Sequence, residues 1–233
     1  MASVTISVQQ DVLAERRQKA AELRDEFSRK GTLVVNVVSS PGAGKTSLLQ
    51  AMARHWNGAF RIAVLVGDIA TERDAERLRP HMPAEQLTTG GACHLEIPLV
   101  RKGLERLGDR PLDFLFIENI GNLVCPASWD LGEHLRVVLL STTEGDDKPG
   151  KYPKMFRTSH VLVITKSDLL PYVPFNVASA IEDAHQIQPQ LSTFVTSALH
   201  DEGVDAWCSY LVEERGRMLK STLLSTHDEN DSP

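Results

Sequence analysis

The stretch SSPGAGKTS, residues 39–47, constrains the fold of this chain more than any other feature. A run rich in β-branched residues, TLVVNVVSS at 32–40, leads into it, and the helical pattern TSLLQAMARHW follows it. The stretch fits the phosphate-binding pattern G-x-x-x-x-G-K-[ST], except that Ser39 stands at the first glycine. A buried strand, a glycine loop and a helix in this order predict a nucleotide-binding α/β domain.

The rest of the chain repeats the alternation of apolar strands and amphipathic helices. Short apolar runs predict further parallel strands at 61–68, 112–119, 134–142, 160–168 and 191–199. Helical patterns lie between several of them, and a last one spans 203–220. We therefore predict a P-loop NTPase fold, a three-layer α/β/α sandwich with a mainly parallel central sheet.

The phosphate loop has a defined chemistry. Its backbone N–H groups and the positive end of the following helix would surround phosphate oxygens. Lys45 is predicted to reach the β- and γ-phosphates, and the Thr46 hydroxyl is predicted to bind Mg²⁺. The nucleotide-binding residues predicted in the loop are Pro41, Gly42, Ala43, Gly44, Lys45, Thr46 and Ser47.

The run VLVITKSDLL predicts which base is bound. It ends a strand with Thr165, Lys166 and Asp168, close to the Asn-Lys-x-Asp pattern of GTPases. A carboxylate can accept two hydrogen bonds from the N1–H and the exocyclic amine of guanine, which adenine cannot offer. Thr165 replaces the usual asparagine, which removes an amide that braces the neighbouring loops. In VTSAL, Ser197 and Ala198 are candidates for a backbone N–H contact with guanine O6.

Three carboxylates are candidates for the magnesium site and for orienting the attacking water. Asp68 and Glu118 each end a predicted strand, where ligand sites of open α/β sheets gather, and Asp74 follows in TERDAERLRP. Asp68 and Glu118 could hold Mg²⁺ directly or through water. Either aspartate could orient the water, and Asp74 could instead pair within its own helix. No arginine is obviously placed as a finger, so slow intrinsic turnover is expected.

These motifs divide the chain into an N-terminal helical extension at 1–30, a P-loop GTPase domain at 31–220 and a disordered polar tail at 221–233. The net charge is −6, whereas nucleic-acid binders are typically basic. No apolar run is long enough to span a membrane. The N-terminus has no apolar signal region, and three cysteines cannot form a full disulfide framework. We therefore expect a cytoplasmic protein.

Cys93 and His94 are adjacent in TTGGACHLE. Thiolate and imidazole suit Ni²⁺ and Zn²⁺, but adjacent residues of these types can equally form a buried structural pair. Cys125 lies seven residues beyond Glu118, in the loop after the same predicted strand. Cys208 occupies the apolar face of a predicted helix and is expected in the core.

From about Thr32 to Leu211 the chain resembles the hydrogenase nickel-incorporation GTPases, the HypB family. The resemblance rests on SSPGAGKTSLL, GDIATERDAERL, TGGACHLE, IENIGNLVCPASWDLGE, LLSTTEGDDKPGKYPKMF and TKSDLLPYV. It implies a homodimer that closes on GTP, a nickel or zinc site at Cys93, His94 and Cys125, and a contact from Lys148 to the partner's nucleotide. It also implies a zinc-containing nickel-delivery partner and the hydrogenase large subunit as the target.

The chain departs from the family in three places. The N-terminal cysteine motif and the histidine-rich tract of many members are absent, so nickel storage is not expected. Glu96 stands where aspartate is more usual, with Pro98 soon after, so the next helix could begin differently. Thr165 is the third departure.

We predict a GTP-hydrolysing nickel chaperone for [NiFe]-hydrogenase, with GTP, Mg²⁺ and Ni²⁺ or Zn²⁺ as ligands. A regulatory GTPase with a structural zinc, a metal-insertion GTPase for another metalloenzyme, and a P-loop kinase are the alternatives. TKSD argues against the kinase.

Overall fold

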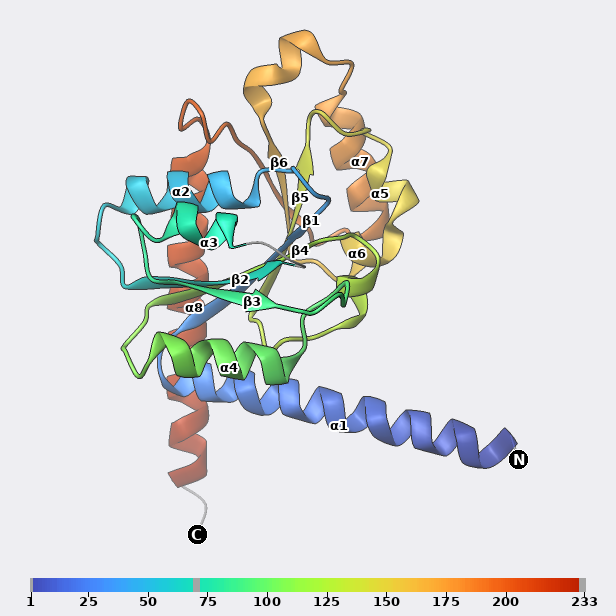
Figure 1. Cartoon of the computed structure of the whole chain (residues 1–233), viewed down its shortest axis with the longest axis vertical. Helices are drawn as coiled ribbons and strands as arrows, with labels where there is room; N and C mark the ends of the chain where they lie inside the picture. The colour runs from blue at the N-terminus through green and yellow to red at the C-terminus, as the bar shows by residue number, and fades with distance from the viewer. Residues whose placement is uncertain (1, 69–71, 231–233) are drawn as a thin grey trace.

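The computed structural model describes residues 2–68 and 72–230 and contains a seven-stranded sheet with helices on both faces (Figure 1). The strand order is β3-β2-β4-β1-β5-β6-β7, and all neighbours pair in parallel. The predicted three-layer sandwich is confirmed. The strands are β1 Leu33–Ser39, β2 Ile62–Asp68, β3 Ala84–Thr88, β4 Phe114–Gly121, β5 Leu135–Ser141, β6 Val161–Thr165 and β7 Ser192–Val195.

The helices connect these strands and cover the sheet. The described residues form α1 Ala2–Arg29, α2 Lys45–Trp56, α3 Arg73–Leu78, α4 Ile97–Leu107, α5 Lys148–Lys151, α6 Pro153–Arg157, α7 Val177–Ile187 and α8 Val204–Asn230, with 3₁₀ turns η1 Cys125–Ser128 and η2 Ser167–Tyr172. None of the helices in this part of the chain combines the length and hydropathy that a membrane span requires.

The alternation of side chains along the central strand β1 builds the two halves of the core. Val35 and Val37 pack with apolar residues of α2 and α8 on one face. Val34 packs on the opposite face with residues of α1 and α4, and Val38 packs on that face with residues of α6 and α7. Since successive side chains of a strand point to opposite faces, both faces of β1 are fully covered.

The C-terminal half of helix α1 packs on the domain. Ala20, Leu23 and Phe27 are buried there. The helix then extends away from the body of the domain toward the N-terminus (Figure 1).

Two elements differ from the sequence-based prediction. Strand β3 was missed because its sequence, AEQLT, carries polar Glu85 and Gln86. It lies at the sheet edge, where backbone hydrogen bonds to β2 suffice to hold a strand without an apolar run. The predicted disordered tail is wrong up to Asn230, because α8 continues that far, and residues 231–233 lie outside the described part.

Candidate functional site

The loop from β1 to α2 is shaped to surround an anion. Gly42 and Gly44 adopt φ of 74° and 97°, a left-handed region that side chains with a Cβ disfavour. Gly44 is the N-cap of α2, so the first free N–H groups of that helix face the loop. The loop lies at the carboxyl edge of a parallel sheet, where open α/β folds bind ligands.

Lys45 begins α2 and turns its amine back into this loop. Its Nζ donates to Ser39 Oγ at 3.1 Å. Burial lowers the pKa of the Lys45 amine below its usual value, and the charge of Glu118 opposes that shift. The serine at the first glycine position of the pattern therefore supplies an acceptor for Lys45, and a phosphate oxygen could replace it.

Glu118 meets the phosphate loop from the neighbouring strand β4. Its Oε1 accepts a hydrogen bond from Thr46 Oγ1 at 2.8 Å. Its Oε2 is buried and has no hydrogen-bond partner among the described residues. Burial raises the pKa of Glu118 to about 7, while Lys45 and Thr46 act in the opposite direction. A buried carboxylate oxygen without a partner, beside a threonine hydroxyl, is a donor set that suits Mg²⁺.

The two candidate aspartates lie near this site but in different surroundings. Asp68 ends β2, and the charges of Asp68 and Asp74 both reach Lys45. Asp74 lies in the first turn of α3 and forms an ion pair with Arg77 at 3.3 Å, the alternative role considered for it. Arg77 Nη2 also lies 3.4 Å from Ser47 Oγ, so an arginine that the sequence did not single out contacts the start of α2.

Lys148 lies over the phosphate loop of its own chain. Its Nζ is 3.2 Å from Glu144 Oε2 and donates to Ser40 Oγ at 3.4 Å. The amine also lies 5.1 Å from the centre of the Tyr152 ring. These contacts place a cation beside Ser40 in the phosphate loop.

The predicted base-binding motif packs directly on the phosphate loop. Thr165 Oγ1 donates to the carbonyl of Ala43 at 2.6 Å, and Lys166 Nζ donates to the carbonyl of Gly42 at 2.8 Å. Thr165 lacks the amide of the usual asparagine, and its hydroxyl makes a contact with the phosphate loop in place of that amide. Both residues line a cavity of about 330 Å³ together with Leu48, Arg54, Ala198 and Leu199.

Ser197 has a different role from the predicted one. Its backbone N–H donates to the carbonyl of Glu202 at 3.0 Å, so this group does not face the cavity. Its hydroxyl instead donates to Asp168 Oδ1 at 2.6 Å. Ser197 therefore orients the carboxylate of Asp168, and Ala198 remains the candidate for a backbone contact with the base.

The two loop cysteines meet at the same edge of the sheet. Cys93 follows β3 and Cys125 follows β4, and these strands flank β2. A hydrogen bond with Cys125 raises the pKa of the Cys93 thiol. Two hydrogen-bonded thiols form a pair that a soft or borderline metal ion would deprotonate and bind.

The imidazole of His94 is held beside this pair. Its Nδ1 lies 3.8 Å from Cys93 Sγ, and its Nε2 lies 3.2 Å from Glu96 Oε1. The ring stacks on the indole of Trp129, with centroids 4.1 Å apart and planes 18° apart. Glu96 is the N-cap of α4 but makes no side-chain cap, since it turns toward His94.

A single chain does not close a metal site. Across residues 2–68 and 72–230, no three histidine, cysteine or acidic side chains converge closely enough to hold a metal ion. Cys93, His94 and Cys125 therefore supply a thiol pair and a neighbouring imidazole rather than a finished set of ligands. Cys208 lies in the core as expected, and burial raises its pKa to about 12.

Sequence reasoning missed residues that support the site from outside the motifs. Trp129 contacts His94, and Arg136 donates to the carbonyl of Trp129. Trp129 lies within the motif IENIGNLVCPASWDLGE, and this position was the sequence signal that could have marked it as part of the site. No pattern in HLRVVLLST indicates a role for Arg136, because a polar residue at the start of a strand is common.

Comparison with known proteins gives consistent matches over most of the chain. The family model described as CobW/HypB/UreG, nucleotide-binding domain, matches residues 33–195. A protein from Azotobacter vinelandii named hydrogenase maturation factor HypB is 42% identical over 219 residues, which cover 94% of this chain and 72% of that protein.

Two solved structures have the same fold. The crystal structure of HypB from Helicobacter pylori in complex with nickel superposes with a TM-score of 0.83 at 38% identity, covering 87% of this chain and 96% of that one. The hydrogenase maturation factor HypB from Archaeoglobus fulgidus gives a TM-score of 0.79 at 34% identity, covering 88% and 99%.

Proposed function

The chain belongs to the CobW/HypB/UreG nucleotide-binding family, with HypB proteins among its relatives, and from this we propose that it is a GTP-hydrolysing nickel chaperone. Its target would be [NiFe]-hydrogenase, in the cytoplasm. One observation supports the proposal most directly. Strand β4 places Glu118 against the phosphate loop and leads seven residues later to Cys125, whose thiol meets Cys93.

In the proposed reaction, water attacks the γ-phosphorus of GTP and the bond between the β- and γ-phosphates breaks, which releases GDP and phosphate. Lys45 would leave Ser39 and bind the β- and γ-phosphate oxygens, where it stabilises the charge that develops on them. Thr46 and Glu118, with Asp68 nearby, would hold Mg²⁺, which neutralises phosphate charge when bound. Asp68 and Asp74 are the candidates for orienting the water.

The guanine base would occupy the cavity beside Thr165 and Lys166. Asp168 would accept hydrogen bonds from the guanine N1–H and exocyclic amine, with Ser197 holding the carboxylate in place. The Lys166 stem would lie along the base, since its amine is already bound to Gly42.

Asp168→Asn is expected to weaken GTP binding by about 10- to 100-fold, because hydrogen bonds to a charged group contribute about 1.5–3 kcal/mol. An amide presents an N–H to the base, so xanthosine triphosphate should become the better ligand. Competition binding of the two nucleotides measures the change. Ser197→Ala keeps the carboxylate of Asp168, so it should weaken GTP binding less than Asp168→Asn does. An unchanged preference for GTP in Asp168→Asn would exclude the guanine-binding role of Asp168.

The metal would be cargo held by thiolates. Cys93, Cys125 and the neighbouring His94 of one chain would supply two sulfur ligands and one nitrogen ligand, and a ligand from a second copy would complete a four-coordinate shell. We therefore propose a homodimer that closes when GTP and metal bind, with Lys148 reaching the partner's nucleotide. Release of nickel on hydrolysis requires that the two nucleotide states bind the metal with different affinity.

A nickel titration in the two nucleotide states tests the proposal. We expect the nickel Kd to differ by at least about fivefold between GDP and a non-hydrolysable GTP analogue, the low end of typical coupling between sites. Cys93→Ala should lose tight nickel binding in both states and keep GTP binding, because only the thiol pair is removed. The dimer mass, recorded in the same samples, should rise with the analogue.

Cys208→Ala is the matched control, since it removes a core thiol far from the loops and should leave nickel binding unchanged. Retained nickel affinity in Cys93→Ala would remove Cys93 from the site. Equal nickel affinity with GDP and the analogue would favour a regulatory GTPase with a structural metal, and zinc competition would identify that metal.

The extended helix α1 is the proposed docking element for a zinc-containing nickel-delivery protein. Val12 and Leu13 are half exposed on it and line a groove with Ile97, Pro98 and Trp129. The groove opens beside His94, so a partner on α1 would lie next to the metal loop. The hydrogenase large subunit would receive the metal in a later step.

A further inference from the structure

Strand β4 carries two neighbouring polar residues to opposite faces of the sheet. Glu118 faces the phosphate loop and contacts Thr46. Asn119 is 2% exposed and faces the other side, where its Nδ2 donates to Asn36 Oδ1 on β1 at 3.1 Å. Since adjacent strand residues point in opposite directions, any shift of this strand end at Glu118 moves Asn119 as well.

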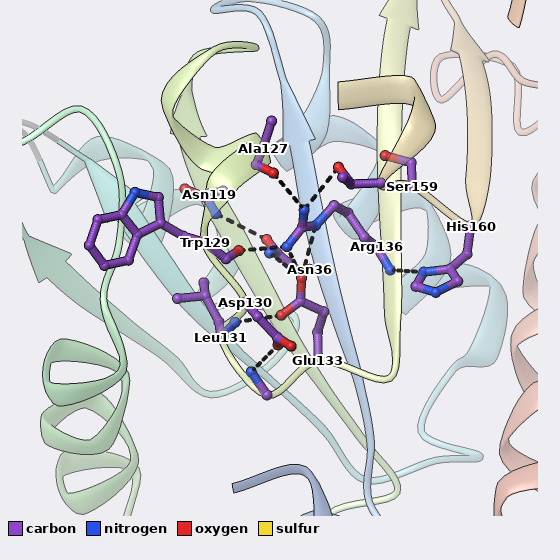
Figure 2. Close-up of polar contacts among 12 residues, drawn as sticks. Asn36, Asn119, Ala127, Trp129, Asp130, Leu131, Glu133, Arg136, Ser159 and His160 are labelled. Carbon is purple, nitrogen blue, oxygen red and sulfur yellow. Dashed lines mark hydrogen bonds and ion pairs between the residues drawn. The ribbon is translucent and has the colours of Figure 1, made fainter. Parts of the chain in front are cut away.

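The contact continues through the buried interior to the loop before β5 (Figure 2). Asn36 Nδ2 donates to Glu133 Oε1 at 3.1 Å, and the same oxygen accepts from Arg136 Nε at 2.9 Å. Glu133 Oε2 accepts from the backbone N–H of Leu131. Asn36, Glu133 and Arg136 are all buried, so each contact is shielded from water.

Arg136 fixes the segment that follows Cys125. Its guanidinium donates to the carbonyls of Ala127 and Trp129, to Thr158 and to Glu133. These contacts use all five N–H donors of the guanidinium. Figure 2 shows the backbone carbonyls of Ala127 and Trp129 pointing at Arg136, while the indole of Trp129 points away from it.

Trp129 connects this network to the metal loop. Its carbonyl is held by Arg136, and its ring stacks on the imidazole of His94. The guanidinium of Arg16 on α1 lies 4.2 Å from the centre of the same ring. The position of the indole therefore depends on Arg136 on one side and sets the position of His94 on the other.

We propose that Asn119, Asn36, Glu133 and Arg136 form a buried network that transmits the nucleotide state from the Glu118 end of β4 to Trp129, which positions His94. The inference rests on the proposed function and deepens it. Breaking one buried hydrogen bond would leave polar groups unpaired away from water, which disfavours the movement of one member of the network without the others. Coupling of two sites requires such an element with two arrangements.

The emission of Trp129 in metal-free protein tests the network without any assumption about nickel. Trp129 is isolated by subtracting the spectrum of Trp129→Phe from that of the wild type in each nucleotide state. We expect this difference spectrum to change between GDP and the non-hydrolysable GTP analogue. In an Asn36→Leu background, which removes the central amide at similar volume, the change should disappear.

Thr32→Val is the matched control. Thr32 is buried at the other end of β1 and donates to the carbonyl of Leu112 at 2.8 Å, outside the network. It should keep the Trp129 response. Asn36→Ser, whose short hydroxyl cannot reach both Asn119 and Glu133, replaces Asn36→Leu if circular dichroism shows that the leucine variant does not fold. A Trp129 response that is missing in the wild type, or that persists without the Asn36 amide, would overturn the proposal.

Nickel titration then separates this inference from the proposed function. The ratio of nickel Kd values in the two nucleotide states should fall from at least about fivefold in the wild type to within about twofold of one in Asn36→Leu. If the nickel Kd values of the wild type are equal in the two nucleotide states, the chaperone function is contradicted. The network is then tested by the Trp129 emission alone. A wild-type ratio that Asn36→Leu retains contradicts the network alone.

Discussion

Replacing Lys45 by alanine is expected to lower the rate of GTP hydrolysis by a factor of about 10²–10³, the effect of removing one donor that stabilises developing charge. Lys45 is the buried cation of the phosphate loop, and its amine donates a hydrogen bond to Ser39. Water cannot replace it well, because the amine lies inside the loop rather than at its surface. Phosphate release under single-turnover conditions measures the loss.

Nucleotide affinity should be measured in the same Lys45→Ala protein, since the β-phosphate also loses a contact. The matched control is Lys102→Ala, which removes an exposed lysine of α4 and should leave both hydrolysis and binding unchanged. Wild-type hydrolysis in Lys45→Ala would refute the assignment of the phosphate loop.

Arg136→Met is expected to lower the free energy of unfolding by about 3–5 kcal/mol, which is the usual effect of removing one partner from a buried ion pair. Glu133 would lose its ion-pair partner in the interior and keep its contacts with Asn36 and the Leu131 N–H. The carbonyls of Ala127 and Trp129 would lose their donor at the same time. The total free energy of unfolding of a small domain is about 5–15 kcal/mol, so this loss is a large part of it.

Urea denaturation of the metal-free protein, followed by circular dichroism, gives the free energy of unfolding. Lys19→Met is the control, because Lys19 forms an ion pair with Glu15 at 2.6 Å in which both side chains are more than half exposed. Such exposed pairs contribute at most about 1 kcal/mol. A loss below about 1 kcal/mol in Arg136→Met would mean that the buried pair does not hold the segment after Cys125.

The fold followed largely from local patterns. The buried strands β1, β4, β5 and β6 are covered on both faces, so their apolar runs were visible in the sequence. Strand β3 was missed because it lies at an edge and is held by backbone bonds to β2, which leave no side-chain signal. The end of α8 was missed because a polar composition argued for disorder.

The candidate site was predictable where its chemistry is contiguous. The loop around Lys45 and the run Thr165–Asp168 each carry several functional groups within a few residues, so their spacing alone indicated phosphate and base contacts. The sequence did not predict which backbone or hydroxyl groups make the hydrogen bonds of the site. Thr165 bracing Ala43, and Ser197 orienting Asp168 instead of facing the base, depend on how two loops pack together.

The sequence by itself determined a nucleotide-binding α/β domain with a phosphate loop, because strand periodicity, glycine conformation and helix starts depend on neighbouring residues. Only the tertiary structure decided that Cys93 meets Cys125 and that Trp129 lies on His94. These contacts join loops that are far apart in the chain. They exist because the order of strands in the sheet brings those loops to one edge, and strand order is set by packing over the whole domain rather than by any local pattern.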